Sequence, residues 1–239
     1  MRKYACSCGD SYFPTKGTIF YQSKLSLKKW FYAIYLISQA RNGISSHELA
    51  RHLSVPPCTA HKIGLRIRAV MGFQGRKLRG KIELDETYHG GAKRGKRGRG
   101  ASGKTPIFGM VERGGRAKLK VTPNVRKGTL MEQITENVHS HSILHTDEFK
   151  PYSTLNRKYR HKVINHSRKV YVEGDVHTNT IEGLWSHLKR GIQGTHVTVS
   201  SKHLQNYANH YEFMWNARLE AKHPFWLILE RAVDLDKKV

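Results

Sequence analysis

The sequence is poor in acidic residues, and this shortage is its most informative feature. Only 18 of the 239 residues are Asp or Glu, against 42 Lys and Arg, which leaves a formal net charge of +24. A chain with so large an excess of positive charge usually meets a polyanion, and nucleic acid is the first candidate. Hydrophobic residues make up 38% of the chain, which is enough to build a core and excludes wholesale disorder.

Long apolar runs and cysteines are also scarce, and their scarcity excludes two further classes of protein. The longest apolar run, 30–37, has eight residues, whereas a membrane helix needs about 20. The first residues include no apolar stretch of the kind found in secretion signals. Three cysteines are too few for a disulfide scaffold. We therefore expect a cytoplasmic protein without a membrane partner.

Residues 1–23 are polar and rich in turn-forming residues, and they contain two of the three cysteines. Cys6 and Cys8 look like half of a metal ribbon, but a structural zinc site usually takes its ligands from two cysteine pairs. Here a single residue separates the pair, and no second pair precedes it. We therefore expect two ordinary cysteines and no bound zinc.

The segment 24–80 has the pattern of a helix-turn-helix domain. Ser45 and Glu48 have the spacing of a capping box at the start of a helix. A break at 54–57 and a second, basic helical stretch over 58–68 follow. The alternative is a plain helical hairpin, which the basic character of the chain disfavours. In a helix-turn-helix domain, the residues of the second helix that face DNA would be Thr59, His61, Lys62 and Arg66.

From residue 81 onwards, strands and helices alternate. The predicted strands are 81–88, 106–113, 117–122 and 142–146, and the predicted helices are 129–138, 177–190 and 200–222. Gly114 and Gly115 predict a hairpin turn between the second and third strands. This order of elements predicts an α/β (α+β) fold, in which helices pack against a mixed sheet.

A glycine-rich basic segment, 93–104, lies between the first two strands. It contains the phosphate-loop string G-x-x-x-x-G-K-T, but such a loop works only between a strand and a helix. Here basic residues precede the string and Pro106 opens a strand after it. We predict instead a flexible loop in which Arg94, Arg97 and Arg99 contact a phosphate backbone.

Three of the scarce acids lie where a metal site would need them. Asp85 lies within the first strand, and Asp147 follows a later strand at the edge where active sites collect residues. Glu182 shares a helical face with Lys189, two turns further on. Two Asp on strands and one Glu on a helix can hold two hard divalent ions, Mg²⁺ or Mn²⁺, which act on a phosphodiester. For each acid alone, the alternative is an ion pair in this basic chain.

Several motifs, spread along nearly the whole chain, point to the same protein family. They are residues 17–20, 28–30, 43–46, 49–50, 83–88, 145–147, 177–185, 188–191, 213 and 216–218. The string Asn-Thr-Ile-Glu-Gly-x-Trp, over 179–185, is the most specific of them. With these motifs the chain resembles bacterial insertion-sequence transposases of the DDE type, specifically those with an ISXO-like catalytic domain behind a zinc ribbon and a helix-turn-helix domain.

The resemblance implies an RNase H-like fold and a divalent metal held by Asp85, Asp147 and Glu182. It also implies cleavage of transposon ends followed by strand transfer. The partner would be double-stranded DNA, both transposon ends and target, on which the protein would form a homo-oligomer. Lys189 and Arg190 would meet this DNA. Some relatives use Asn in place of the third acid, so Asn179 remains an alternative to Glu182.

These observations divide the chain into four expected parts. They are a remnant of a zinc ribbon (1–23), a helix-turn-helix domain (24–80), a catalytic domain (81–222) and a C-terminal tail (223–239). Two other functions remain open, an RNase H-like nuclease without strand transfer and a non-enzymatic helix-turn-helix DNA-binding protein. The three acids argue against the second, because carboxylates repel a phosphate backbone unless a metal intervenes.

Overall fold

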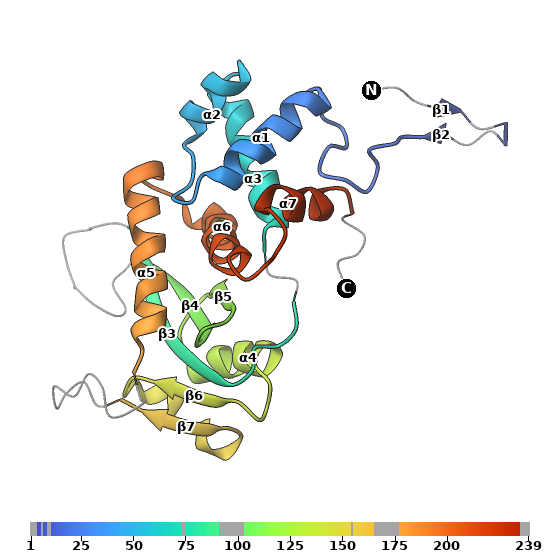
Figure 1. The fold of residues 1–239 in the computed structure, drawn as a ribbon. Helices are drawn as coiled ribbons and strands as arrows, with labels where there is room; N and C mark the ends of the chain where they lie inside the picture. The colour runs from blue at the N-terminus through green and yellow to red at the C-terminus, as the bar shows by residue number, and fades with distance from the viewer. Residues whose placement is uncertain are drawn as a thin grey trace.

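The computed structural model places a helical unit beside a five-stranded sheet that carries its own helices (Figure 1). It describes residues 4–5, 7–8, 11–72, 75–90, 103–153, 155–164 and 177–234. Cys6, Arg94, Arg97, Arg99 and most of the phosphate-loop string lie outside these ranges, so the predictions for them remain predictions. Within the described ranges, no helix is both long enough and apolar enough to cross a membrane.

The helical unit begins with the predicted helix-turn-helix elements. Its helices are α1 (Leu27–Gln39), α2 (Ser46–Leu53) and α3 (Pro57–Val70). The Ser45 hydroxyl accepts the backbone N–H of Glu48 at the start of α2, as its spacing predicts. Ser54, in the left-handed conformation, ends α2. Pro57 opens α3, where a missing N–H costs nothing.

Both ends of the chain help to close the core of this unit. Ile19 and Phe20 are buried in it, although they precede the first helix. Helix α7 (Pro224–Ala232) contributes the buried Ile228 and packs against α1. The prediction that 223–239 form a tail is therefore wrong for the residues of α7. The apolar face of α7 packs against α1, which is far away in the sequence, and local sequence does not reveal such a contact.

The second unit is built on the mixed sheet. Its strands are β3 (Lys81–His89), β4 (Thr105–Glu112), β5 (Ala117–Val121), β6 (Ile143–Thr146) and β7 (Arg160–Val163). The strand order is β5-β4-β3-β6-β7; β4 is antiparallel to its neighbours, and β6 and β7 run parallel to β3. This is the RNase H-like arrangement. A separate hairpin pairs β1 (Tyr4–Ala5) with β2 (Ser11–Tyr12).

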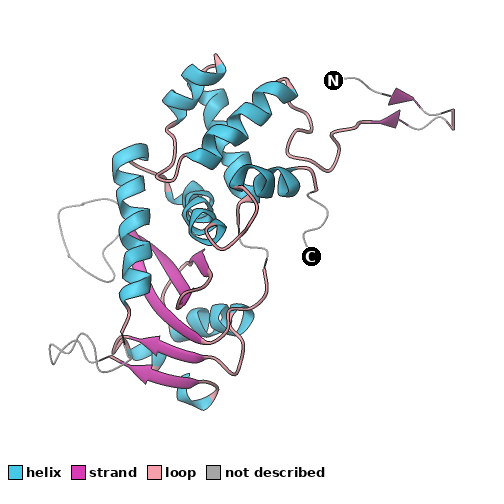
Figure 2. Ribbon diagram, in the orientation of Figure 1, coloured by secondary structure: helices cyan, strands magenta, loops and turns pink. Residues whose placement is uncertain are grey.

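Helices cover both faces of the sheet (Figure 2). Helix α4 (Lys127–Asn137) packs on one face, and α5 (Asn179–Gly191) and α6 (Leu204–Ala217) pack on the other. Strand β3 alternates between these faces, so Ile82 and Leu84 lie on the α4 side. Glu83 and Asp85 lie on the α5 side, where they meet residues of that helix.

Polar side chains of α6, rather than another strand, cover the outer edge of β5. The Asn216 amide accepts the N–H of Ala117 at 2.7 Å and donates to the carbonyl oxygen of the same residue at 2.9 Å. Glu212 accepts the N–H of Leu119 at 2.6 Å. An exposed strand edge is a template for unwanted pairing, so these side chains both attach α6 to the sheet and protect its edge.

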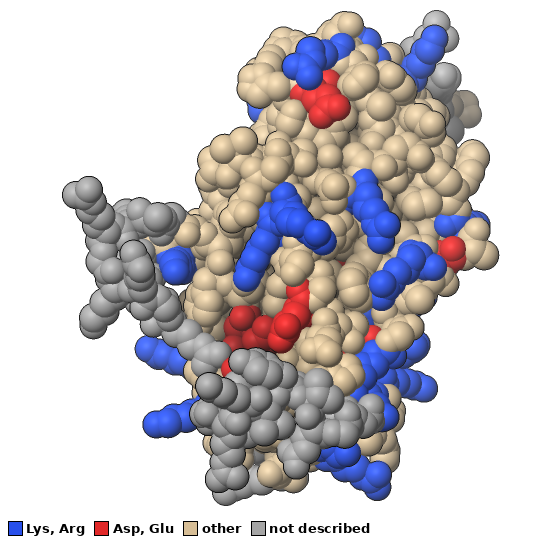
Figure 3. Space-filling model, turned by 60° about the vertical axis from the view of Figure 1, so that its left-hand side comes forward, with Lys and Arg blue, Asp and Glu red and all other residues tan. Residues whose placement is uncertain are grey.

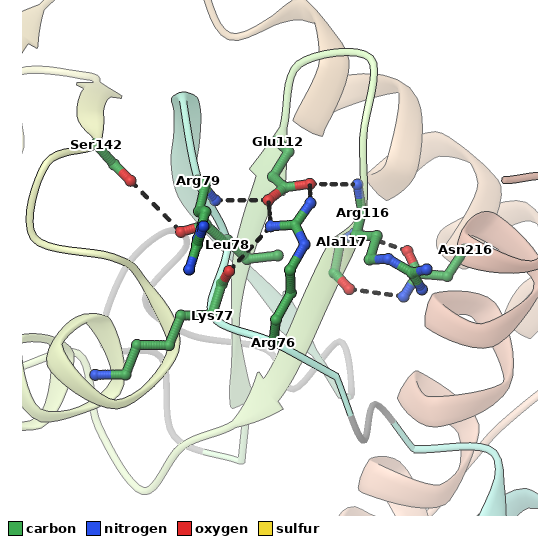
Figure 4. Close-up of polar contacts among 9 residues, drawn as sticks. All are labelled: Arg76, Lys77, Leu78, Arg79, Glu112, Arg116, Ala117, Ser142 and Asn216. Atoms are coloured by element: carbon green, nitrogen blue, oxygen red, sulfur yellow. Dashed lines mark hydrogen bonds and ion pairs between the residues drawn. The ribbon is translucent and has the colours of Figure 1, made fainter.

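The connection between α3 and β3 is fastened to the sheet by one buried acid, Glu112 (Figure 4). Its carboxylate accepts hydrogen bonds from the Arg76 guanidinium at 2.9 Å and from the Arg79 backbone N–H at 2.6 Å. It also accepts the N–H of Arg116 at 3.1 Å, across the β4–β5 turn. Three groups from two segments thus share one carboxylate, which fixes where β3 begins.

A buried arginine lies where the helical unit meets α6. Arg68 donates to the carbonyl oxygen of Ile44 at 3.1 Å, and its guanidinium lies 4.6 Å from the centroid of the Tyr207 ring. Two histidines lie near it. Burial, reinforced by the Arg68 charge, lowers the pKa of His196 to about 3 and the pKa of His210 well below its usual range. Both rings are therefore neutral in the folded protein.

We expect the protein to lose stability as the pH falls below about 6.5, the ordinary pKa of histidine. The unfolded chain takes up a proton there, whereas His196 stays neutral in the fold until its pKa of about 3 is reached. Between these values the unfolded state binds more protons, so acidification favours it. The melting temperature should therefore fall between about pH 7 and about pH 5, and it should fall less in His196→Gln. The exposed His141→Gln is the control, and equal falls in His196→Gln and the parent protein would contradict this account.

Candidate active site

Asp85, in the middle of β3, and Asp147, the residue directly after β6, come from two neighbouring parallel strands. Strands β3 and β6 pair in parallel, with Glu83 opposite His145. Continued by two residues, this register sets Asp85 level with Asp147. Neighbouring strands lie about 4.8 Å apart, so the two carboxylates start from adjacent positions. Both are partly exposed, as groups that meet a ligand must be.

A buried tyrosine and a buried acid lie beneath this pair. The Tyr152 hydroxyl donates to the carboxylate of Glu86, which follows Asp85 and points to the opposite face of β3. Burial raises the pKa of Tyr152 well above its usual range, and the charges of Glu86, Asp85 and Asp147 raise it further. Tyr152 is therefore protonated and acts as a donor to Glu86.

Asp85 is held by a tryptophan of α5. The Trp185 indole N–H donates to the Asp85 carboxylate at 2.9 Å. Gly109 lies opposite Asp85 in the β3–β4 register. A Cβ atom at Gly109 would lie 2.6 Å from the Trp185 ring, so the missing side chain makes room for the indole on the sheet. The sequence indicates that Trp185 packs on the sheet, but only the register shows that Gly109 receives it.

Asp147 is held by its own loop. Its carboxylate accepts the backbone N–H of Phe149 at 3.0 Å. The Thr146 hydroxyl donates to the carbonyl oxygen of Asp147 at 2.8 Å and lies 2.8 Å from His161 Nε2. Burial lowers the pKa of His161, which keeps this ring neutral beside the acid. The loop therefore has a fixed backbone where it leaves β6.

Buried Glu83 fixes the first turn of α5. Its carboxylate accepts the Arg113 Nε–H at 2.7 Å, the Thr180 hydroxyl at 3.0 Å and the Ile181 N–H at 3.0 Å. Arg113 also donates to the carbonyl oxygen of His177 at 2.6 Å. A carboxylate at a helix N-terminus, paired with a guanidinium, is well compensated for its burial. The alternation of the strand predicts that Glu83 shares a face with Asp85. The sequence does not predict that Arg113 contacts Glu83, because this contact depends on the pairing of β3 with β4.

The third acid is on the surface of the turn that Glu83 fixes. Glu182 and Asn179 are both exposed, and the Glu182 carboxylate accepts the Thr178 hydroxyl at 3.3 Å. Lys189 and Arg190 are exposed further along α5. On this side of the molecule, Asp and Glu side chains form a group with Lys and Arg side chains above it (Figure 3). Within the described part of the chain, however, no three His, Cys, Asp or Glu side chains converge as metal ligands.

The predicted DNA-contacting residues of α3 have different surroundings. Thr59, Lys62 and Arg66 line a cleft of about 700 Å³ between α3 and residues 22–25. The Arg66 guanidinium donates to the carbonyl oxygens of Ile19 and Tyr21, so it holds the N-terminal segment. The ring of His61 lies 5.5 Å from the ring of His203 and so faces the sheet unit. Lys62 remains exposed on the surface of α3.

Comparisons with known proteins give consistent matches. A family model described as an ISXO2-like transposase domain matches residues 77–216. A protein of the transposable element ISH50 from Halobacterium salinarum is 26% identical over 253 aligned positions, which cover 98% of this chain and 85% of that protein. A transposase-like protein from Haemophilus influenzae is 34% identical over 97 residues, which cover 40% of this chain and 77% of that protein.

A chain in the crystal structure of a pre-cleavage Mos1 transpososome aligns with 83% of this chain and 78% of its own length. The TM-score is 0.32 and the sequence identity 11%, so the likeness is weak. The family match is the stronger finding, because it spans more than half of the chain and includes Asp85, Asp147 and Glu182. The chain belongs to the family with an ISXO2-like transposase domain.

Proposed function

We propose that this protein cleaves DNA at transposon ends and joins the cut strand to target DNA in a reaction that requires a divalent metal ion. One observation carries the proposal: Asp85 on β3 and Asp147 directly after β6 come from neighbouring parallel strands, in a chain with a net charge of +24. Two adjacent carboxylates would repel a phosphodiester unless a cation intervened. The basic remainder of the chain attracts the same phosphodiester.

The donors on β3 and β6 suit Mg²⁺ or Mn²⁺. These hard ions take oxygen ligands, and Mg²⁺ is commonly held by one or two carboxylates together with water and substrate phosphates. Two carboxylates therefore satisfy its protein requirement before DNA binds. We propose Asp85, Asp147 and Glu182 as the ligands of one or two ions. When bound, the metal would polarise the scissile phosphate and lower the pKa of the attacking oxygen nucleophile.

The other residues of the site bind and orient. Trp185 holds the Asp85 carboxylate in one direction, and Glu83 fixes the turn that carries Glu182. Lys189 and Arg190 extend from the same helix, where they would meet phosphates beside the cleavage position. We propose that Lys62 contacts the duplex DNA of the transposon end. We also propose that the protein forms a homo-oligomer that brings two transposon ends together.

Glu182 is favoured over Asn179 as the third ligand. Trp185 follows Glu182 by three residues and contacts Asp85 directly, so Glu182 lies one turn from the acid pair. Asn179 lies a further turn away. A charged oxygen is also a better ligand than an amide for a hard divalent ion.

The function is tested by incubating the protein with a plasmid that carries the DNA flanking its gene, with and without Mg²⁺. Cleaved ends together with joined products support transposition. Cleaved ends that never join identify a nuclease without strand transfer, and retention of the DNA without cleavage identifies a binding protein. Sequencing of the product junctions distinguishes these three results.

Removing either strand acid should abolish cleavage without abolishing binding. In Asp85→Asn or Asp147→Asn, metal-dependent cleavage should fall by at least about a hundredfold. DNA affinity should stay the same or rise slightly, because a charge that repels phosphate is gone. Gel-shift and cleavage assays measure the two properties separately. Glu132→Gln, on the exposed surface of α4, is the control, and full cleavage by Asp85→Asn would show that the site is misassigned.

Three variants along α5 separate its functions. Glu182→Gln should lose cleavage, because an amide replaces a charged ligand, whereas Asn179→Ala should lose less. Lys189→Ala should mainly weaken DNA binding and reduce the dependence of affinity on salt. Cleavage rates measured over a range of Mn²⁺ concentrations compare the first two variants. If Glu182→Gln cuts normally and Asn179→Ala does not, the third position belongs to Asn179.

Gly109→Ala should impair cleavage although it leaves every acid in place. The added methyl group would meet the Trp185 ring and displace the indole from Asp85, so we expect a loss of about 10–100-fold. Gly183→Ala is the matched control. Gly183 lies on α5 with open space around it, and the change should stabilise the helix by up to about 1 kcal/mol. Equal cleavage by the two variants would exclude a positioning role for the Trp185 contact.

A further inference from the structure

A second cleft lies beside the proposed active site, between the end of β3 and the last turns of α5. Its volume is about 350 Å³, and its walls include Tyr88, His89, Leu188, Lys189, Gln193 and Val197. Lys189 links it to the active site, because this residue lies two turns beyond Glu182 on α5. A DNA strand that passes the acids along α5 therefore reaches this cleft next.

The lining of the cleft suits a nucleobase attached to a phosphate. It contains an aromatic residue on the α5 side of β3, His89, and the apolar residues Leu188 and Val197. Among the described residues that line it, Lys189 is the only Lys or Arg, and none is Asp or Glu. The Gln193 amide is both donor and acceptor, so it can pair with the edge of any base.

Val197 has an unusual backbone conformation at this cleft. Its φ of 61° and ψ of −56° place it at the centre of a γ-turn, which the N–H of Thr198 closes on the carbonyl oxygen of His196 at 2.6 Å. A β-branched residue with positive φ is strained. The residue is nonetheless 79% exposed, so no buried contact of its own compensates for the strain. Strain of this kind persists where the surroundings impose it, and it gathers at functional sites.

The residues on both sides impose this conformation. Before it, a π-helical turn, Ile192–His196, ends with the His196 ring 4.7 Å from the Tyr207 ring. After it, Val199 is buried, and its carbonyl oxygen lies 2.9 Å from His89 Nε2. Val197 thus lies between two packed residues at the cleft, and π-helical turns are frequent at functional sites.

We propose that this cleft binds one unpaired nucleotide of the DNA strand at the cleavage position, a proposal that rests on the function proposed above. A base inside a duplex is covered by its stacked neighbours, so a recessed cleft receives it only after it leaves the stack. The cleft volume lies near the lower end of the range for small-molecule sites, about 300–1,000 Å³, which suits one nucleotide. Val197 packs against the base, and Lys189 meets the phosphate.

The test compares binding of the full chain to two labelled probes in the presence of EDTA. One probe is a blunt duplex, and the other is the same duplex with a short single-stranded thymidine extension. The extended duplex should bind more tightly. Val197→Gly and Val197→Ser should each reduce this preference by about fivefold and leave the affinity for the blunt duplex unchanged. Val163→Ser, at an exposed valine of β7, is the matched control and should keep the preference.

Thermal unfolding separates binding from folding. Glycine adopts positive φ without strain, so Val197→Gly should melt at the same temperature as the parent protein or higher while it loses the preference. Equal binding of both probes by the parent protein would overturn the proposal, and so would an undiminished preference in Val197→Gly. Because EDTA removes cleavage from this test, the proposed reaction and the nucleotide site can fail independently. If the protein cleaves DNA but does not prefer the extended duplex, only the nucleotide site is rejected. If it shows a preference that depends on Val197 but does not cleave DNA, only the proposed reaction is rejected.

Discussion

The contact of Trp185 with Gly109 and Asp85 is the constraint on which the proposed site depends. Because Gly109 has no side chain, the indole lies on the sheet and its N–H reaches the Asp85 carboxylate. Glu83 holds the first turn of the same helix. Two contacts less than two turns apart therefore fix α5, and they set both the direction of Asp85 and the place of Glu182. A shift of α5 would disturb both acids together.

Three buried acids of this chain, Glu83, Glu112 and Glu212, show that the scarcity of acidic residues does not by itself identify an active site. Glu83 holds the first turn of α5, Glu112 fastens the connection to β3, and Glu212 covers the edge of β5. All three accept backbone N–H groups that no strand or helix neighbour satisfies, which is a structural task. Asp85, within β3, and Asp147, directly after β6, differ from them in being partly exposed. Exposure and position, rather than rarity, distinguish acids that could meet a ligand from acids that support the fold.

Local signals in the sequence predicted much of the fold, and distant contacts account for what it missed. The start of α2 at Ser45 and the alternation of β3 depend on neighbouring residues, so they were predicted. Strand β7 was missed because Arg160–Val163 is a largely exposed edge strand without an apolar alternation. The use of Arg66 was also missed, because its partners are backbone carbonyls more than forty residues away. The sequence places Asp85 on one strand and Asp147 after another, but only the parallel pairing of β3 and β6 shows that these two strands are neighbours.

The turn after α5 connects the two units of the molecule. His196 faces inward, where its ring contacts Tyr207 and leaves no space for a side chain at Gly43: a Cβ atom there would lie 2.5 Å from His196 Nε2. Val197, the next residue, faces the cleft beside Lys189. The γ-turn at Val197 is closed by a hydrogen bond to the His196 carbonyl oxygen. The conformation that directs Val197 outward therefore depends on the packing of His196 against Tyr207. The contact between the helical unit and α6 therefore fixes the position of the cleft relative to the helix-turn-helix elements.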